Sequence, residues 1–163
     1  MATPQESPHF LEPQPVEKLF NRVFGFLVGL GLGLEYNYLL QVRGRKSGRV
    51  YSMPVNVLDV AGKRYLVAPR GRTQWVRNAE AAGEIALKKG RYRQTFALRP
   101  IPDADKPELL KLYLERFATA VQRYFPVPAG SELPAFLRLA PNYPVFELLR
   151  PSAPKRRPTL PRT

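Results

Sequence analysis

The 163-residue sequence contains no cysteine and a single histidine, His9. A chain without cysteine forms no disulfides and has neither a thiolate nucleophile nor a cysteine-ligated zinc or iron–sulfur cluster. Because His9 lies in a proline-rich leader, we also exclude a Ser-His-Asp triad, a histidine metal site and a histidine general base. If the protein is an enzyme, we therefore expect a bound cofactor to carry the chemistry, and we expect no metal.

Acidic residues are scarce, with 13 Asp and Glu against 26 Lys and Arg, which gives a formal net charge of +13. This excess predicts an anionic partner, namely nucleic acid, a membrane surface or a polyanionic small molecule. Hydrophobic residues make up 44% of the chain, enough for a core, so we do not expect wholesale disorder. The length corresponds to about one domain.

The two ends of the chain differ in composition from the middle. Residues 1–15 are rich in proline and lack Lys and Arg, which does not match a secretory signal, and residues 151–163 form a basic, proline-rich tail. We predict that both are disordered and that residues 16–150 form a single domain. An apolar helix is expected at 16–35, where the apolar run of 12 residues is shorter than the ~20 needed to span a bilayer.

That apolar helix is interpreted as a cover over one end of the core. The alternative interpretation is that residues 16–34 lie in a membrane interface. We therefore expect a cytoplasmic protein, with peripheral contact at the inner face of the membrane as the second possibility for its location.

Alternating apolar and polar residues between glycine-containing turns predict six strands, with few helices among them. The strands are expected at 38–43, 50–60, 64–68, 85–89, 92–98 and 145–149, with helices at 74–82, from Asp103 onward and near 133–139. Thr73 is expected to cap the first of these helices and Gly83 to end it. The buried stripe of the long helix is predicted to be Leu109, Leu110, Tyr113, Leu114, Phe117 and Val121. This order predicts an α+β fold, a small antiparallel barrel with helices on its outside.

Three stretches without an acidic residue, 41–52, 63–77 and 88–99, hold 14 of the 26 basic residues. In the first, Arg45, Lys46 and Ser47 stand between Gly44 and Gly48 in a predicted hairpin turn. A guanidinium, an ammonium, a hydroxyl and turn N–H groups together bind phosphate or carboxylate oxygens. The alternative interpretation is an ordinary solvated turn.

The helix expected after Thr73 is a second element that can bind an anion, because its first N–H groups have no partner within the helix. Trp75 and Asn78 are three residues apart on it and share a face, so both side chains can address one ligand. The alternative for Trp75 is a core position. An amide such as that of Asn78 on a buried face requires a hydrogen-bonding partner.

Five short motifs follow one another in an order that resembles the deazaflavin-dependent nitroreductase family, the coenzyme F-420-dependent quinone and nitro reductases. They are Leu39-Leu40-x-Val42-x-Gly44-Arg45-Lys46-Ser47-Gly48-Arg49, Met53-Pro54-Val55, Tyr65-Leu66-Val67-Ala68-Pro69, Trp75-Val76-Arg77-Asn78 and Pro144-Val145-Phe146-Glu147-Leu148. The resemblance covers residues 36 to 150. It implies a split β-barrel of the FMN-binding type, with the polyanionic coenzyme F-420 as cofactor and FMN as the alternative.

The resemblance also implies an activity, the transfer of a hydride from reduced deazaflavin to a small lipophilic quinone, nitro compound or activated alkene, and a homodimer is one assembly it allows. By position, Arg45, Lys46 and Ser47 resemble the phosphate-binding turn. Arg49 and Arg70 resemble residues that contact the acidic tail of the cofactor. The backbone at Pro54, Val55 and Ala68 resembles positions that line its ring, and Trp75 and Asn78 resemble helix residues that close over the cofactor.

No catalytic residue is identified by the resemblance, and Tyr113, Tyr124 and Tyr143 are the candidates for a proton donor. A third function, from a different class, is a nucleic-acid-binding barrel, for which the stacking residues would be Tyr51, Tyr65, Tyr92 and Phe96. We expect no specific nucleic-acid partner, because half-buried strands show the same alternation of arginine and aromatic residues.

Overall fold

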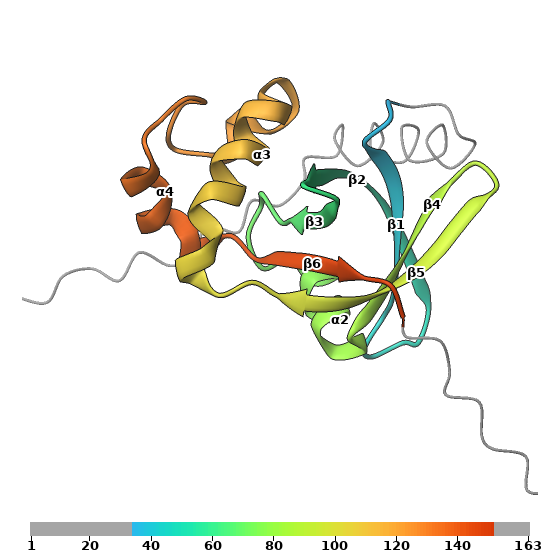
Figure 1. Ribbon diagram of the computed structural model, residues 1–163. Helices are drawn as coiled ribbons and strands as arrows, with labels where there is room; N and C mark the ends of the chain where they lie inside the picture. Colours follow the sequence, from blue (N-terminus) through green and yellow to red (C-terminus); the bar gives the residue numbers. More distant parts are fainter. Residues whose placement is uncertain (1–33, 152–163) are drawn as a thin grey trace, which may run out of the picture.

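The computed structural model describes residues 34–151, which form a six-stranded antiparallel barrel closed in the order β1-β2-β3-β6-β5-β4 (Figure 1). Within these residues, three α-helices and three short 3-10 helices accompany the barrel. The elements are β1 (Asn37–Arg43), β2 (Val50–Val60), β3 (Lys63–Val67), α2 (Gln74–Ala82), β4 (Glu84–Lys89), β5 (Tyr92–Pro100), η1 (Asp103–Asp105), α3 (Lys106–Val121), η2 (Gln122–Tyr124), α4 (Leu133–Leu139), η3 (Ala140–Asn142) and β6 (Val145–Leu149). The predicted α+β fold, a small antiparallel split β-barrel with flanking helices, is confirmed.

The six strands and three helices fall at their predicted places, with one exception at the start of the long helix. Asp103 opens only the 3-10 turn η1, and α3 begins at Lys106 with Pro107 in its first turn. An α-helix that began at Asp103 would require an N–H from Pro107, and its ring would clash with the Asp103 carbonyl. The predicted start of the helix is therefore wrong by three residues.

The interior of the barrel is one of two hydrophobic cores, and α2 supplies part of it. Strand side chains such as Leu40, Leu87 and Phe96 pack there with Val76 and Ala79 of α2, both fully buried. These strand residues alternate with outward-facing ones, as the period of two residues in a β-strand requires. Helix α2 is therefore fixed to the barrel core by its apolar face.

The second core lies between the outer face of the barrel and the helices α3 and α4, which stand to one side of it in Figure 1. Leu58, Tyr65 and Val145 of the barrel meet the helical residues Leu110 and Phe136 there. Of the predicted stripe on the long helix, every residue is buried except Leu109, which is partly buried at the edge of this core. The helix departs from α geometry at Phe117, where φ is −117° and ψ is 22°.

The predicted apolar helix at 16–35 lies outside the described residues except for its last two positions, and so do the leader at 1–15 and the tail beyond residue 151. Leu34, the first described residue, is 59% exposed. Within residues 34–151, no helix is long and apolar enough to cross a bilayer.

Candidate anion-binding site

The turn between β1 and β2 is compact and is closed by its own backbone. The Gly44 N–H donates to the Arg49 carbonyl at 2.7 Å, and the Gly48 N–H donates to the Gly44 carbonyl at 2.9 Å. Gly48 has a φ of +69°, which a side chain would disfavour. A Cβ on Gly44 would lie only 2.6 Å from Cε2 of Tyr51, so the ring of Tyr51 packs directly on this glycine.

Arg45 joins this turn to α2 by three hydrogen bonds. Its Nη1 donates to Oε1 of Gln74 at 2.9 Å and to Oδ1 of Asn78 at 2.8 Å, and its backbone N–H donates to the same Asn78 oxygen at 3.3 Å. The structure therefore brings together Arg45 and Asn78, two residues that the sequence placed in separate motifs. The partner that the Asn78 amide requires is Arg45.

The electrostatics of this contact are unusual for an arginine, because both acceptors are neutral. The oxygens of Gln74 and Asn78 orient the Arg45 guanidinium without cancelling its charge, and within residues 34–151 no carboxylate forms an ion pair with it. Lys46 and Arg49 extend exposed side chains from the same turn. Such a set of donors, lacking acidic residues, suits a phosphate or carboxylate group.

Ser47 forms local contacts inside the turn. Its Oγ accepts the Arg49 N–H at 3.3 Å and lies 3.2 Å from Oη of Tyr51. Tyr51 is itself 49% exposed and covers one side of the turn. The hydroxyl of Ser47 thus has a structural role in shaping the turn, beside the ligand contact predicted for it.

Thr73 occupies the N-cap position of α2, but the predicted cap hydrogen bond from its side chain is absent. Its Oγ1 is buried and has no hydrogen-bond partner within the described residues. Buried hydroxyls are usually satisfied, and a bound group is one way to satisfy this one. Thr73 directly precedes Gln74, one of the two residues that hold Arg45.

Trp75 lies in the barrel core. It is 8% exposed, and its ring contacts that of Phe146 edge-on, with the centroids 6.3 Å apart. The alternative interpretation, that Trp75 is a core residue, is confirmed. Its role over a cofactor stays a prediction and would involve only the small exposed part of the indole.

Pro54 faces away from Val55 and Ala68. Val55 packs against the barrel core, to which Ala68 belongs with 1% exposure, and Pro54 precedes Val55 on β2 and faces the other way. Ala68 follows β3, and its carbonyl accepts the Gly71 N–H at 3.1 Å, which starts the connection to α2. Only backbone atoms at these positions can share one ligand, which is the role predicted for them.

Arg70 and Tyr124, two further predicted residues, are neighbours. The Arg70 guanidinium carbon lies 5.6 Å from the centre of the Tyr124 ring, and that of Arg123 lies 4.8 Å from it. The Oη of Tyr143 donates to the backbone carbonyl of Tyr124 at 2.6 Å. Tyr124 is therefore fixed by its backbone and has two cations near its ring.

Tyr113 and Tyr143 are both buried, at 2% and 7% exposure. Burial raises the pKa of Tyr113 well above its usual range, and the hydrogen bond with Asn56 opposes this only in part. Burial likewise raises the pKa of Tyr143 to about 12. Both hydroxyls therefore keep their protons at neutral pH.

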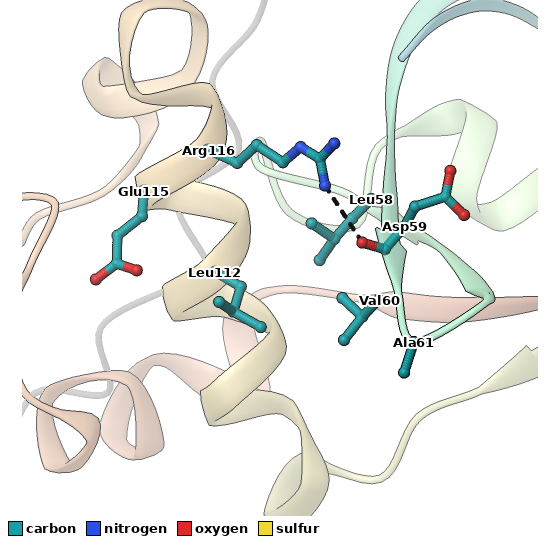
Figure 2. A pocket seen from close by; sticks show the side chains of 7 residues that line it. All are labelled: Leu58, Asp59, Val60, Ala61, Leu112, Glu115 and Arg116. Carbon is teal, nitrogen blue, oxygen red and sulfur yellow. Dashed lines mark hydrogen bonds between the residues drawn. The ribbon is translucent and has the colours of Figure 1, made fainter. Parts of the chain in front are cut away.

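A shallow groove of about 530 Å³ runs between the β2–β3 turn and α3, away from the Arg45 turn (Figure 2). Its apolar walls include Val60 and Leu112, and Arg116 reaches across to the Asp59 carbonyl, to which its Nη1 donates at 3.3 Å. None of the residues that line it is a predicted site residue. The groove and the anion-binding turn are separate features.

The structure contradicts the aromatic surface expected of a nucleic-acid-binding barrel. Phe96 is 3% exposed inside the barrel and Tyr65 is 9% exposed in the second core, so neither can stack with a base. The two were predicted as stacking residues because alternation alone does not tell which face of a strand turns into the barrel, as at Phe96, or whether helices cover its outer face, as at Tyr65. Tyr51 and Tyr92 are exposed.

Gln74 is not among the predicted site residues, although it contacts Arg45 as directly as Asn78 does. The spacing could have indicated this residue, because Gln74 and Asn78 are four residues apart and therefore neighbours on one helix face. It was not recognised because the likeness to known motifs begins at Trp75. Within residues 34–151, no cluster of acidic or histidine residues could hold a metal ion.

Known proteins show the same fold and identify a family. A structure of a protein of unknown function from Agrobacterium tumefaciens is 18% identical with a TM-score of 0.51, and the match covers 87% of this chain and 58% of that one. This chain thus spans just over half of that protein. A structure described as a domain-swapped dimer is 17% identical with a TM-score of 0.50, with 83% and 99% covered.

A structure described as an F420-H2 dependent reductase (FDR-A) is 19% identical with a TM-score of 0.46, and the match covers 70% of this chain and 94% of that one. No curated protein sequence matches the chain. The family model described as F420H(2)-dependent quinone reductase matches residues 18–128, which is more than half of the chain. The chain therefore belongs to the F420H(2)-dependent quinone reductase family.

Proposed function

We propose that this protein binds reduced coenzyme F-420 and reduces a quinone with it. The observation that carries the proposal is the Arg45 guanidinium, which neutral oxygens hold in place and which keeps its positive charge in a turn shared with Lys46. The buried hydroxyl of Thr73, at the N-cap position of the helix that holds Arg45, has no hydrogen-bond partner in the described part of the chain. These features fit a ligand that carries a phosphate group.

In this proposal Arg45 and Lys46 bind the phosphate of the cofactor. Arg49 and Arg70 attract the carboxylates of its acidic tail, and the backbone at Pro54, Val55 and Ala68 lies along the ring. F-420, when bound, supplies a hydride. The protein contributes the binding energy and the orientation of donor and acceptor, and no side chain has to act as a nucleophile.

Reduction of a quinone to a quinol consumes one hydride and one proton, so a proton donor or water is also required. The Tyr143 hydroxyl is engaged in a hydrogen bond that it donates to the Tyr124 carbonyl, and Tyr113 is buried in the second core. Tyr124 is the least buried of the three candidates. We propose that its Oη is the one that faces the acceptor and that Tyr143 holds it in position.

The proposal is tested by titrating purified protein into coenzyme F-420 and following the fluorescence of the deazaflavin. We expect saturable quenching at low salt, and we expect the protein to oxidise reduced F-420 when a soluble naphthoquinone is added. Nitroaromatic compounds and activated alkenes, tested in parallel, define the acceptor class. Absence of saturable binding contradicts the proposal, and a yellow protein that carries FMN after purification favours the FMN alternative.

The oligomeric state of the protein and its contact with a membrane are also proposals. One similar structure is described as a domain-swapped dimer, which supports a homodimer, and light scattering of the purified chain measures the mass directly. Contact of residues 16–34 with a membrane stays a prediction, and flotation with anionic vesicles tests it.

A further inference from the structure

Helix α2 holds two arginines that come from outside it, and it holds them by different chemistry. Arg72 is bound by the carboxylate of Glu80, with Nε and Nη2 at 3.0 and 2.6 Å from Oε2. Arg45 is bound by two amide oxygens, those of Gln74 at 2.9 Å and Asn78 at 2.8 Å. The helix therefore offers a direct comparison between a neutralised arginine and one whose charge is left in place.

The difference has a physical consequence for anion binding. A carboxylate neutralises most of the charge of the guanidinium that it contacts, and an added anion must then compete with it. An amide oxygen is a hydrogen-bond acceptor without a net charge. It can orient a guanidinium and leave the attraction for a second, anionic ligand almost unchanged.

Asn78 is suited to this task by its burial as well as its chemistry. Its side chain is 7% exposed, and its Oδ1 accepts from both the backbone and the guanidinium of Arg45. Gln74 lies one helical turn earlier at the exposed end and accepts from the same Nη1. The guanidinium is thus held through one nitrogen, and Nε and Nη2 remain to bind the two oxygens of a planar or tetrahedral anion.

We propose that Asn78 and Gln74 are positioning residues that hold Arg45 for the phosphate of the cofactor, and that both must be neutral for the site to work. Asn78 then acts through Arg45 and does not itself contact the phosphate. Of the two arginines that α2 holds, Arg45 binds the phosphate and Arg72, already paired with Glu80, does not. The identity of the phosphate as that of F-420 rests on the proposed function.

The test replaces the neutral acceptors by carboxylates of the same shape, in Asn78→Asp and Gln74→Glu. We expect Asn78→Asp to raise the Kd for F-420, measured by fluorescence quenching, about tenfold, the effect of weakening one charge-assisted hydrogen bond. The KM for reduced F-420 should rise by a similar factor, with kcat at saturation changed by less than about twofold, since the reacting groups are not touched.

Thermal unfolding separates this role from a structural one. At the exposed position 74 a new carboxylate forms an ion pair with Arg45 without being buried, so Gln74→Glu should be at least as stable as the unmodified protein although it binds F-420 less tightly, whereas Asn78→Asp also has to bury its charge. Gln74→Glu, at an exposed position, gives a second test with little risk to folding. Glu80→Gln is the matched control, because it changes a carboxylate to an amide on the same helix and leaves Arg45 and its two acceptors untouched, so its Kd and KM should not rise.

A titration with inorganic phosphate, followed by the NMR signal of the Arg45 Nε–H, tests the inference without F-420. We expect phosphate to shift this signal in the unmodified protein and much less in Asn78→Asp. Equal shifts and an equal Kd for F-420 in the two proteins would overturn the positioning role and leave the proposed function standing. If phosphate gives the expected difference but F-420 does not bind, the proposed function fails and the positioning role is retained.

Discussion

Asn78 accepts two hydrogen bonds from Arg45 with one oxygen, from the guanidinium at 2.8 Å and from the backbone N–H at 3.3 Å. This contact makes the β1–β2 turn and α2 a single unit. The opposite face of α2 carries Val76 and Ala79, which are fully buried in the barrel core. The anion-binding turn is therefore braced by the core of the protein, although its own residues are exposed.

The double substitution Arg45→Ala/Lys46→Ala should abolish binding of F-420 and leave the fold intact. Two contacts to a charged group, each worth about 1.5–3 kcal/mol, correspond to at least a hundredfold rise in Kd. Stability should fall by no more than about 2 kcal/mol, because both side chains are exposed and the buried Asn78 oxygen keeps its hydrogen bond from the backbone N–H of residue 45. Fluorescence titration and urea unfolding measure the two effects, with Arg72→Ala as the control arginine. Undiminished binding by the double variant would rule out this turn as the phosphate site.

Gly44→Ala should destabilise the protein by about 1–3 kcal/mol, the usual cost of inserting a methyl group into a packed site. The new Cβ would lie 2.6 Å from the Tyr51 ring and 2.8 Å from Ser47 Oγ. The cost should shrink in a Tyr51→Ala background, because the closest contact is then gone. Urea unfolding of the two single variants and the double variant gives the coupling between the sites. Additive effects would mean that the ring does not restrict this glycine.

Stability should fall steeply in alkaline solution because of the buried tyrosines. The folded-state pKa of Tyr143 is raised from 10.0 to about 12, so the unfolded chain loses this proton first. The contribution is fully present below pH 10 and is lost as the pH rises from 10 toward 12, with a slope of at most about 1.4 kcal/mol per pH unit. Tyr143→Phe should make the fall shallower, while losing about 1 kcal/mol at neutral pH with the hydrogen bond to Tyr124. Urea unfolding over this pH range checks both effects, and identical slopes would contradict the assignment.

Lys106→Met should lower the free energy of unfolding by about 1–3 kcal/mol, because it removes a charge-assisted hydrogen bond to the buried Ala140 carbonyl, which keeps only the bond from the Tyr143 N–H. The Lys106 ammonium is almost fully buried and donates to Oδ1 of Asp103 at 2.6 Å and to the Ala140 carbonyl at 3.2 Å. Asp103→Asn should cost less than about 1 kcal/mol, because the Asp103 side chain is 57% exposed. Chemical denaturation compares the two. A larger loss for Asp103→Asn would show that the ion pair, and not the carbonyl contact, secures the start of α3.

The elements of the fold could be predicted because the apolar period and the turn residues are local features. Gly83 ends α2 as expected, and the strand from Val50 to Val60 has its predicted limits. The start of the long helix was wrong because Asp103 satisfies the capping pattern, whereas Pro107 prevents a regular helix from beginning there. Where a capping residue and a proline favour different starts for a helix, the local sequence does not show which of them decides it.

The candidate site was predicted only as separate parts. Arg45, Lys46 and Asn78 were selected for their chemical groups, but nothing local indicated that Arg45 would bind Asn78. Gln74 was missed for the same reason, since its role depends entirely on a partner from another element. The burial of Trp75 in the core could be stated as one of two interpretations, and only the packing of α2 decided between them.

The sequence by itself determined the absence of cysteine chemistry, the basic character of the chain, the strand and helix pattern, and the turn with its two cations. These depend on composition and on periods of two to four residues, which neighbouring residues establish. The tertiary structure alone decided which arginine keeps its charge, Arg45 beside amides or Arg72 beside Glu80. For Arg45 that outcome depends on contacts with residues far apart in the chain, and such contacts form only when the barrel closes and α2 packs against it.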